Sequence, residues 1–341
     1  MEIANGSNII SELDLRLVNA LQLRPRAEWT ELAAAFGVTP ATVARRWQAL
    51  NEQGLAWVAV TLGQPHIQAS GSAFALVSCT ADAVPDLTRR MVQEPAIATI
   101  ATTMGRSRFL LDVLQPDLDG LRSYLGNRLD TLPGVTEVTS LLVITLYTGG
   151  QSWRIRALDA AEARHLSTRP DGSAQGRRRG RAVDLDRVLI RELATDGRLS
   201  WAQLATRCGI SAPTARRRVE RLLAAGTIAL RCDVATPVVG SSLHVTFLMQ
   251  LPAAQLDTAG AFIAAMPRCR LAAAVAGRHN LLATMWFSAV SEIVQFEKTV
   301  TQRLPDLVVD DRIVHLGAAK RLGHVLDTEG RTTGLVPLTA W

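Results

Sequence analysis

The chain has 341 residues, of which 48% are hydrophobic and 20% charged. This balance predicts extensive cores in more than one domain and excludes a largely disordered chain. Lysine and arginine number 37 against 31 acidic residues, and the net charge of +6 favours a polyanionic partner such as nucleic acid. The N-terminal residues lack a secretory pattern, and no apolar run approaches the roughly 20 residues that cross a bilayer, so we expect a cytoplasmic protein without a membrane partner.

Residues 8–58 are predicted to form three short helices. Apolar residues recur at helical spacing up to a break around Pro25, and a second helix over 29–36 ends at Gly37, a residue that suits a left-handed helix terminus. Thr39 is expected to cap a third helix that has proline at its first position. Two helices joined by a tight glycine-containing turn indicate a helix-turn-helix.

The third helix has two faces of different character. Val43, Trp47 and Leu50 share one face and are expected to pack inward. The opposite face carries arginine, glutamine and threonine, which bind phosphates and base edges in the major groove. The candidate DNA contacts of this helix are Thr39, Ala41, Thr42, Arg45, Arg46 and Gln48.

Residues 70–150 are predicted to form an α+β domain in the order βαββαβ, the ferredoxin-like arrangement. Strands are expected at about 74–79, 96–103, 108–114 and 135–147, with helical patterns after the first and the third. Helices cover only one face of such a sheet, so its other face needs a partner.

Residues 157–182 are predicted to be a linker, because they mix proline, glycine and serine with a basic cluster. Within that cluster, Arg179-Gly180-Arg181 has an alternative interpretation as a contact to an A/T-rich minor groove. The solvated linker is the simpler of the two.

The rest of the chain repeats the first part at a constant shift of 172 positions (209 minus 37), which aligns Gly37 with Gly209. We therefore predict a second winged-helix-like helix-turn-helix over 183–230, a second ferredoxin-like domain over 241–322 and a C-terminal tail over 323–341. The two sheets are expected to pack against each other, which makes the chain a pseudo-dimer. Whether chains associate further into dimers or larger assemblies stays open.

The second helix-turn-helix has stronger start signals than the first. Ser200 and Gln203 form a capping-box pattern, whereas the first copy has Glu28 where serine or threonine would cap better. The candidate DNA contacts of the second recognition helix are Ser211, Pro213, Thr214, Arg216, Arg217, Arg218 and Arg221. Because the two recognition helices differ, we predict an operator on double-stranded DNA with two unlike half-sites.

The sequence resembles the leucine-responsive/asparagine-type (Lrp/AsnC) transcriptional regulators. The resemblance rests on Leu13-Asp14, Leu32-Ala33, the run from Gly37 to Val43, Arg45-Arg46, Leu50 and Gly54, and again on the stretch from Leu185-Asp186 to Gly226-Thr227-Ile228. It implies DNA-binding heads, sensor domains that dimerise and bind amino acids or related small molecules, and regulation of transcription.

The turn between the central strands departs from the pattern of that family. The family usually has Gly-Asp-Tyr-Asp, whereas this chain has basic or polar residues after both glycines. An amino group would lose its counter-charge there, so we hypothesise that the effector is an anionic metabolite rather than an ordinary amino acid, or that there is none. The candidate effector contacts are Gly105, Arg106, Arg108, Gly277, Arg278 and His279.

Two other functions compete with that of a specific regulator. Siroheme decarboxylases resemble the same family, but of the six histidines here only His279 lies at the equivalent turn, so we expect no enzyme activity, metal or cofactor. A sensor or architectural protein that has lost specific DNA recognition is the third interpretation.

Overall fold

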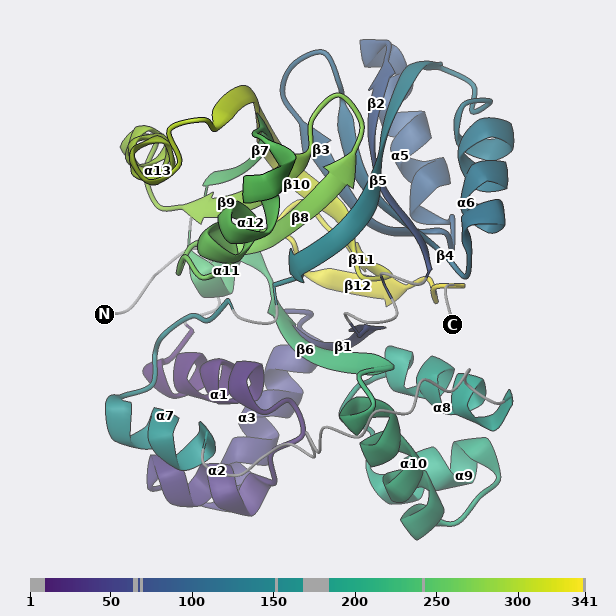
Figure 1. The fold of residues 1–341 in the computed structure, drawn as a ribbon. Helices are drawn as coiled ribbons and strands as arrows, with labels where there is room; N and C mark the ends of the chain where they lie inside the picture. Colours follow the sequence, from purple (N-terminus) through teal and green to yellow (C-terminus); the bar gives the residue numbers. More distant parts are fainter. Residues whose placement is uncertain are drawn as a thin grey trace.

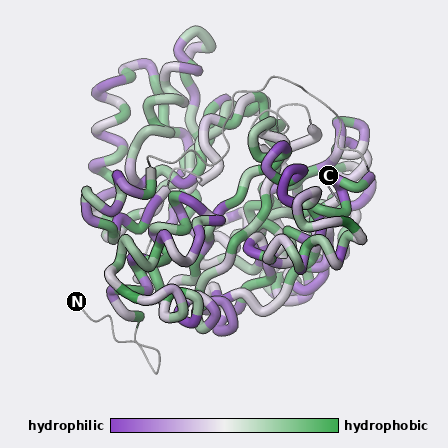
Figure 2. Tube along the Cα trace, turned by 90° about the horizontal axis from the view of Figure 1, so that it is seen from below, coloured by the Kyte–Doolittle hydropathy of each residue, from purple (hydrophilic) through white to green (hydrophobic). Residues whose placement is uncertain are grey.

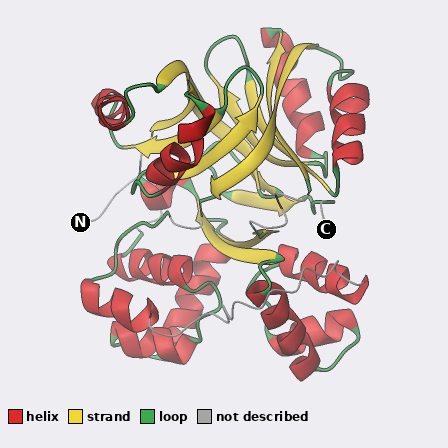
Figure 3. Ribbon diagram, in the orientation of Figure 1, coloured by secondary structure: helices red, strands yellow, loops and turns green. Residues whose placement is uncertain are grey.

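The computed structural model describes residues 10–63, 67, 70–150, 153–167, 184–240 and 243–339. Two all-helical heads lie side by side beneath a β-rich upper part whose helices cover the outside of the strands (Figures 1 and 3). Along the helical segments, hydrophilic and hydrophobic residues alternate, as expected for amphipathic helices (Figure 2). No described helix combines the length and the apolar character that a membrane crossing requires.

Each head is a three-helix unit, and corresponding helices begin 172 positions apart (184 minus 12). The helices are α1 Glu12–Leu23, α2 Trp29–Phe36 and α3 Pro40–Glu52 in the first head, and α8 Asp184–Thr195, α9 Trp201–Cys208 and α10 Ala212–Ala224 in the second. Gly37 and Gly209 end α2 and α9 with φ of 67° and 65°, in the left-handed region that favours glycine. The predicted capping box of Ser200 and Gln203 is present, and Glu28 makes no side-chain cap, so these expectations are confirmed.

The upper part contains two βαββαβ units. The first consists of β2 Gly71–Cys79, α5 Val84–Val92, β3 Ile97–Thr103, β4 Phe109–Gln115, α6 Leu118–Tyr124 with a π-helical extension Leu125–Leu129, and β5 Val135–Thr148. The second consists of β7 Leu243–Gln250, α12 Leu256–Ala264, β8 Cys269–Ala276, β9 Leu281–Phe287, α13 Ser291–Arg303 and β10 Val308–Arg321. Short 3-10 turns precede α5 and α12. The ferredoxin-like prediction is confirmed in both halves.

The two four-stranded sheets join at both edges. The strand orders are β3-β4-β2-β5 and β8-β9-β7-β10, and the last strand of each half pairs antiparallel with the second strand of the other, β5 with β8 and β10 with β3. These eight strands therefore form a closed ring that leaves no free edge in the sensor pair. The predicted pseudo-dimer is thus held by backbone hydrogen bonds as well as by packing.

Among the described residues, the sensor strands and helices pack around three larger hydrophobic cores, and a small cluster that includes Trp57 and Leu322 joins β1 to the end of β10. The inner core combines both halves, with Phe74, Leu110 and Leu141 facing Leu248 and Leu282. Two outer cores lie between each sheet and its helices. Successive side chains of a strand point to opposite faces of the sheet, so they alternate between the inner core, which both halves share, and an outer core, which belongs to one half.

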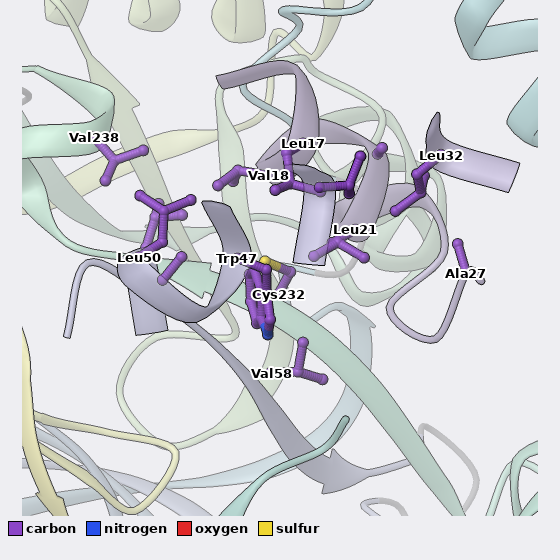
Figure 4. Close-up of a cluster of buried hydrophobic side chains, with 14 of the residues drawn as sticks. Leu17, Val18, Leu21, Ala27, Leu32, Trp47, Leu50, Val58, Cys232 and Val238 are labelled. Atoms are coloured by element: carbon purple, nitrogen blue, oxygen red, sulfur yellow. The ribbon is translucent and has the colours of Figure 1, made fainter. Parts of the chain in front are cut away.

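The heads are tied to each other by a two-stranded ribbon, β1 Ala56–Leu62 paired antiparallel with β6 Ile228–Val234. Each strand contributes to both heads. Cys232 and Val238 from the second copy belong to the core of the first head, with Val238 on the side of Leu50 (Figure 4), and Val60 from the first copy packs into the core of the second. Neither head therefore has a complete core without the other half of the chain.

Two segments are more structured than predicted. Part of the expected linker forms α7 Ala160–Ser167, which packs on α1 through the buried Leu166 and an ion pair between Glu162 and Arg16. The predicted basic cluster at 177–181 lies outside the described residues. The expected tail forms β11 His324–Leu326 and β12 Thr332–Leu335, which extend the sheet from β10, and Thr332 N donates to Gly54 O at 3.0 Å. A short helix, α11 Thr236–Val239, follows β6.

Candidate nucleic-acid interface and central cavity

Both recognition helices, α3 and α10, turn their predicted apolar faces inward. Val43, Trp47 and Leu50 are buried in the first head, and the equivalent Ala215, Val219 and Leu222 are buried in the second. The opposite faces point to solvent. The residues with exposed side chains there are Thr39, Ala41, Arg45, Gln48, Ser211, Pro213, Arg216, Arg217 and Arg221, while Thr42, Arg46, Thr214 and Arg218 are half-buried.

Four of the candidate DNA-contacting residues take part in the N-terminal caps of the recognition helices. Thr39 and Ser211 cap α3 and α10 by accepting from the amides of Thr42 and Thr214, and the hydroxyl groups of each pair lie 2.9 Å apart. These bonds satisfy amides of the first turn and hold the N-terminus of each recognition helix in one geometry.

Three of the candidate arginines are bound to the first helix of their own head. Arg46 lies 3.4 Å from Asp14, and the equivalent Arg218 lies 2.9 Å from Asp186, which also accepts from Arg221 at 2.8 Å. Asp14 and Asp186 are only 4% and 3% exposed. Because removing a charge from a buried pair leaves the other uncompensated, these contacts orient the recognition helices, a role that sequence reasoning did not assign to them.

Arg45 and the equivalent Arg217 differ from these three. Both are exposed, and within the described ranges neither has an ion-pair partner. Arg216 is exposed too, but its Nε bonds Glu220 one turn further on at 2.8 Å. Arg45 and Arg217 therefore offer the guanidinium groups that are most available to a phosphate or a guanine.

A reciprocal clamp fixes one head against the other. Arg26 of the first head donates to the carbonyl oxygens of Gly197 and Leu199 at 2.5 and 2.7 Å and lies 3.9 Å from the ring centroid of Trp201.

Arg198, the equivalent of Arg26, repeats these contacts in the other direction. It donates to the carbonyl oxygens of Pro25 and Ala27 at 2.5 and 2.8 Å and lies 3.8 Å from the ring centroid of Trp29. Burial lowers the pKa of Arg26 and of Arg198 to about 10, which leaves both charged at neutral pH. The clamp is two-fold symmetric, as expected for two copies facing each other across one axis.

The predicted effector residues lie on the two turns between the central strands. Arg106 is exposed and bonds Glu137 at 2.8 Å, while His279 Nε2 lies 3.2 Å from Asp310. Gly105 has φ of 108°, which its turn requires. The six predicted effector residues (Gly105, Arg106, Arg108, Gly277, Arg278 and His279) do not line the cavity between the two sheets, so the effector contact at these turns stays a prediction.

A cavity of about 140 Å³ lies inside the closed ring, between the two sheets. Its cationic lining comes from three segments far apart in the sequence, with Arg231 on β6, Arg270 on β8 and Arg321 at the end of β10. Apolar side chains of both copies, among them Phe74, Leu110 and Leu282, form much of the remaining lining. Sequence reasoning missed this site, because the three arginines lie on strands far apart in the sequence and no local motif connects them.

One buried carboxylate joins the three arginines. Asp233, 1% exposed, lies 2.5 Å from Arg231, in direct contact with Arg270, and 4.0 Å from Arg321. Burial works against ionisation, but the three guanidinium groups prevail and hold the pKa of Asp233 below its ordinary value. Asp112 also lines the cavity, and burial raises its pKa to about 6.

Two histidines in the same cavity are neutral. His244 stacks on Trp286 with centroids 4.1 Å apart, and His315 Nε2 lies 2.8 Å from Thr246 Oγ1. Burial, with a further contribution from the charge of Arg321, lowers the pKa of His315 to about 4 and that of His244 further still. At neutral pH the imidazoles therefore offer hydrogen bonds and no charge.

The cavity does not follow the internal two-fold symmetry. Positions equivalent by the shift of 172 to the arginines and to His244 hold Ala59, Ala98, Gly149 and Ser72 in the first copy. The second copy thus supplies all three arginines of the cavity, and the equivalent positions of the first copy hold only alanine or glycine.

Comparison with known proteins agrees with this architecture. A family model described as the AsnC-type helix-turn-helix domain matches residues 10–51 and 184–223, and one described as the Lrp/AsnC ligand binding domain matches residues 72–150. The Bkd operon transcriptional regulator of Pseudomonas aeruginosa is 25% identical over 139 residues, which are 40% of this chain and 91% of that protein. The HTH-type transcriptional regulator LrpA of Mycobacterium tuberculosis is 49% identical over 45 residues, 13% of this chain and 30% of that protein.

Two solved structures of one enzyme match nearly the whole chain. The siroheme decarboxylase NirDL covers 95% of both chains with a TM-score of 0.58 and 12% identity, and its complex with an iron-uroporphyrin III analogue gives 0.59 and 13% over 92% of this chain and 93% of that one. At this identity the likeness concerns the fold alone.

Heads, ribbon and sensor pair together define a protein with two DNA-binding heads on a duplicated ligand-binding body. The chain contains two AsnC-type helix-turn-helix domains and an Lrp/AsnC ligand-binding domain, and its internal repeat is consistent with tandem duplication of an Lrp/AsnC-type unit.

Proposed function

We propose that this chain is a sequence-specific DNA-binding transcriptional regulator in which one polypeptide does the work of a dimer. The observation that carries the proposal is the reciprocal clamp of Arg26 and Arg198, together with the β1–β6 ribbon, because they hold two exposed recognition helices in a fixed relation. A regulator of this kind acts where the DNA is, which in bacteria such as those of the two curated relatives is the cytoplasm.

Recognition of one duplex by both heads requires successive major grooves, roughly 34 to 36 Å apart. Arg45 and Arg217 are the strongest candidates for base or phosphate contacts, since both are exposed and occupy equivalent positions. Their neighbours differ, with Ala44 and Gln48 in α3 against Arg216 and Glu220 in α10. The two heads therefore read unlike half-sites.

Alanine variants at the two equivalent arginines test the proposal. Arg45→Ala and Arg217→Ala should each weaken operator binding by roughly 5- to 150-fold, the equivalent of about 1 to 3 kcal/mol. Arg122→Ala, an exposed arginine on α6 of the sensor domain, is the matched control and should leave affinity unchanged. Equal and negligible effects of all three variants would contradict the assignment.

A decarboxylase acting on a tetrapyrrole is the second candidate. It is favoured by the likeness to NirDL over almost the entire fold and by His244 and His315 facing three arginines in the cavity. Against it, a cavity of about 140 Å³ is far smaller than a tetrapyrrole. Absorbance titration with iron uroporphyrin III separates the two functions, because a regulator should produce no saturable spectral change.

A further inference from the structure

We propose that the central cavity binds one small carboxylate with an apolar body per chain, held by Arg231, Arg270 and Arg321, and that its occupancy is transmitted to the DNA-binding heads through β6. The binding site itself is independent of the proposed function. The transmission to the heads rests on it.

The balance of charge in the cavity calls for an anion. Three guanidinium groups face Asp233 and Asp112, so the cluster keeps a net positive charge whether Asp112 is protonated or not. Arg231, Arg270 and Arg321 are all nearly buried, with side chains 10%, 9% and 12% exposed. An uncompensated buried charge is costly, and a carboxylate paired with guanidinium groups relieves that cost.

Arg321 is the arginine best placed to receive the ligand. Its nearest approach to Asp233 is 4.0 Å, longer than the contacts of the other two, and its NH1 donates to the carbonyl oxygen of Val234 at 3.1 Å. Arg231 and Arg270 hold Asp233 in place and close the cationic wall around it. A ligand carboxylate can thus pair with Arg321 without displacing Asp233.

The size and the opposite wall of the cavity define the rest of the ligand. A protein cavity of about 150 Å³ lined by apolar residues accommodates benzene, and this one has about 140 Å³. Phe74, Leu110, Leu114 and Leu282 supply its apolar surface. The ligand is therefore a short-chain or single-ring carboxylate rather than a larger metabolite.

The asymmetry of the cavity fixes the stoichiometry. The first copy holds alanine or glycine at the positions equivalent to the three arginines, so the two-fold axis does not generate a second cationic wall. One chain thus binds one ligand, although it contains two sensor domains.

The strand β6 connects this site to the heads. Arg231 lines the cavity and pairs with Asp233 on the same face of the strand, while Cys232 and Val234 on the opposite face are buried in the core of the first head. The same strand begins four residues after α10 ends (228 minus 224) and pairs along its length with β1. A shift of Arg231 on ligand binding therefore moves backbone that both heads share.

Calorimetry on the full chain tests the site with benzoate and hexanoate as probes and with benzamide and hexanamide as uncharged matches. We expect a carboxylate to bind with one site per chain and its amide to bind at least about tenfold more weakly, since the amide lacks the charge. Arg321→Gln should reduce carboxylate binding about tenfold or more, and Arg312→Ala, which removes an arginine paired with Glu297 on the outer surface, should not. If neither carboxylate binds below about 10 mM, or if Arg321→Gln binds as the parent does, the site is refuted.

A second variant protects the test against misfolding. Ala101→Leu fills the cavity from the apolar side and leaves every arginine in place, so it should abolish carboxylate binding while the chain still binds DNA. Retained carboxylate binding in this variant would overturn the location of the site.

Operator affinity with and without the bound carboxylate tests the transmission. A change of roughly 5-fold or more, the usual range of allosteric coupling, supports it. Carboxylate binding with unchanged operator affinity overturns the transmission and leaves the site, whereas absence of specific DNA binding both with and without the carboxylate would refute the proposed function instead.

Discussion

Replacing Arg26 by alanine removes half of the clamp between the heads. The change deletes two hydrogen bonds to carbonyl oxygens on the other head and one cation–π contact at 3.9 Å, and it leaves Arg198 with its own bonds intact. Each head keeps its core, because Arg26 does not belong to either hydrophobic cluster.

The size of the effect follows from these contacts. Hydrogen bonds from a charged donor contribute about 1.5 to 3 kcal/mol each, and a desolvated cation–π contact about 2 kcal/mol. Burial offsets part of this, since lowering the pKa of Arg26 to about 10 corresponds to roughly 3 kcal/mol of desolvation. We therefore expect Arg26→Ala to reduce the free energy of unfolding by about 3 kcal/mol. Arg26→Lys keeps the charge but loses the planar guanidinium group, so its free energy of unfolding should lie between those of the parent protein and Arg26→Ala.

Urea denaturation followed by circular dichroism measures the free energy of unfolding. DNA-binding assays measure whether the two heads keep the spacing that a complete operator requires. Affinity for a complete operator should fall in Arg26→Ala, while affinity for a single half-site should stay within about two-fold, because only the relation between the heads is lost. Unchanged unfolding and unchanged affinity for the complete operator would refute the role of the clamp.

Three further changes test other parts of the structure. Burial raises the pKa of Asp112 to about 6 from 3.8, so the folded state retains a proton that the unfolded state releases. Stability should therefore fall by up to about 3 kcal/mol as pH rises through that window, and urea titrations of Asp112→Asn should lack the fall. Asp186→Asn leaves Arg218 and Arg221 without their buried partner and should destabilise the second head by about 3 kcal/mol, visible as faster amide exchange in α10. Trp47→Ala should lower the stability of the first head by about 3 to 5 kcal/mol, because it removes a large buried side chain. Binding to the half-site of the first head should then be lost, while binding to the other half-site remains.

Local signals in the sequence were enough to predict the elements and their order. Gly37 and Gly209, the caps at Thr39 and Ser211, and the apolar faces of α3 and α10 follow from the rules of helix ends and helical spacing, and all are present. The duplication was also readable, because a fixed shift preserves residues with special backbone geometry.

Contacts between distant segments were not predictable in the same way. The pairing of β1 with β6, the exchange of Cys232 and Val60 between heads, and the helix α7 depend on tertiary packing rather than on local propensity. The cavity escaped notice for the same reason, since its three arginines meet only after the ring of strands has closed. The resemblance to the family points to turn residues such as Arg106 and His279, which do not line that cavity.

Selection of binding sites from random duplex DNA by the full chain tests the central claim most directly, that one polypeptide presents two unlike recognition helices to one duplex. The structure predicts sites with two dissimilar half-sites centred about 10 to 10.5 base pairs apart, each occupied by a single chain. Recovery of perfect inverted repeats alone, or of sites that need two chains for occupancy, would contradict it.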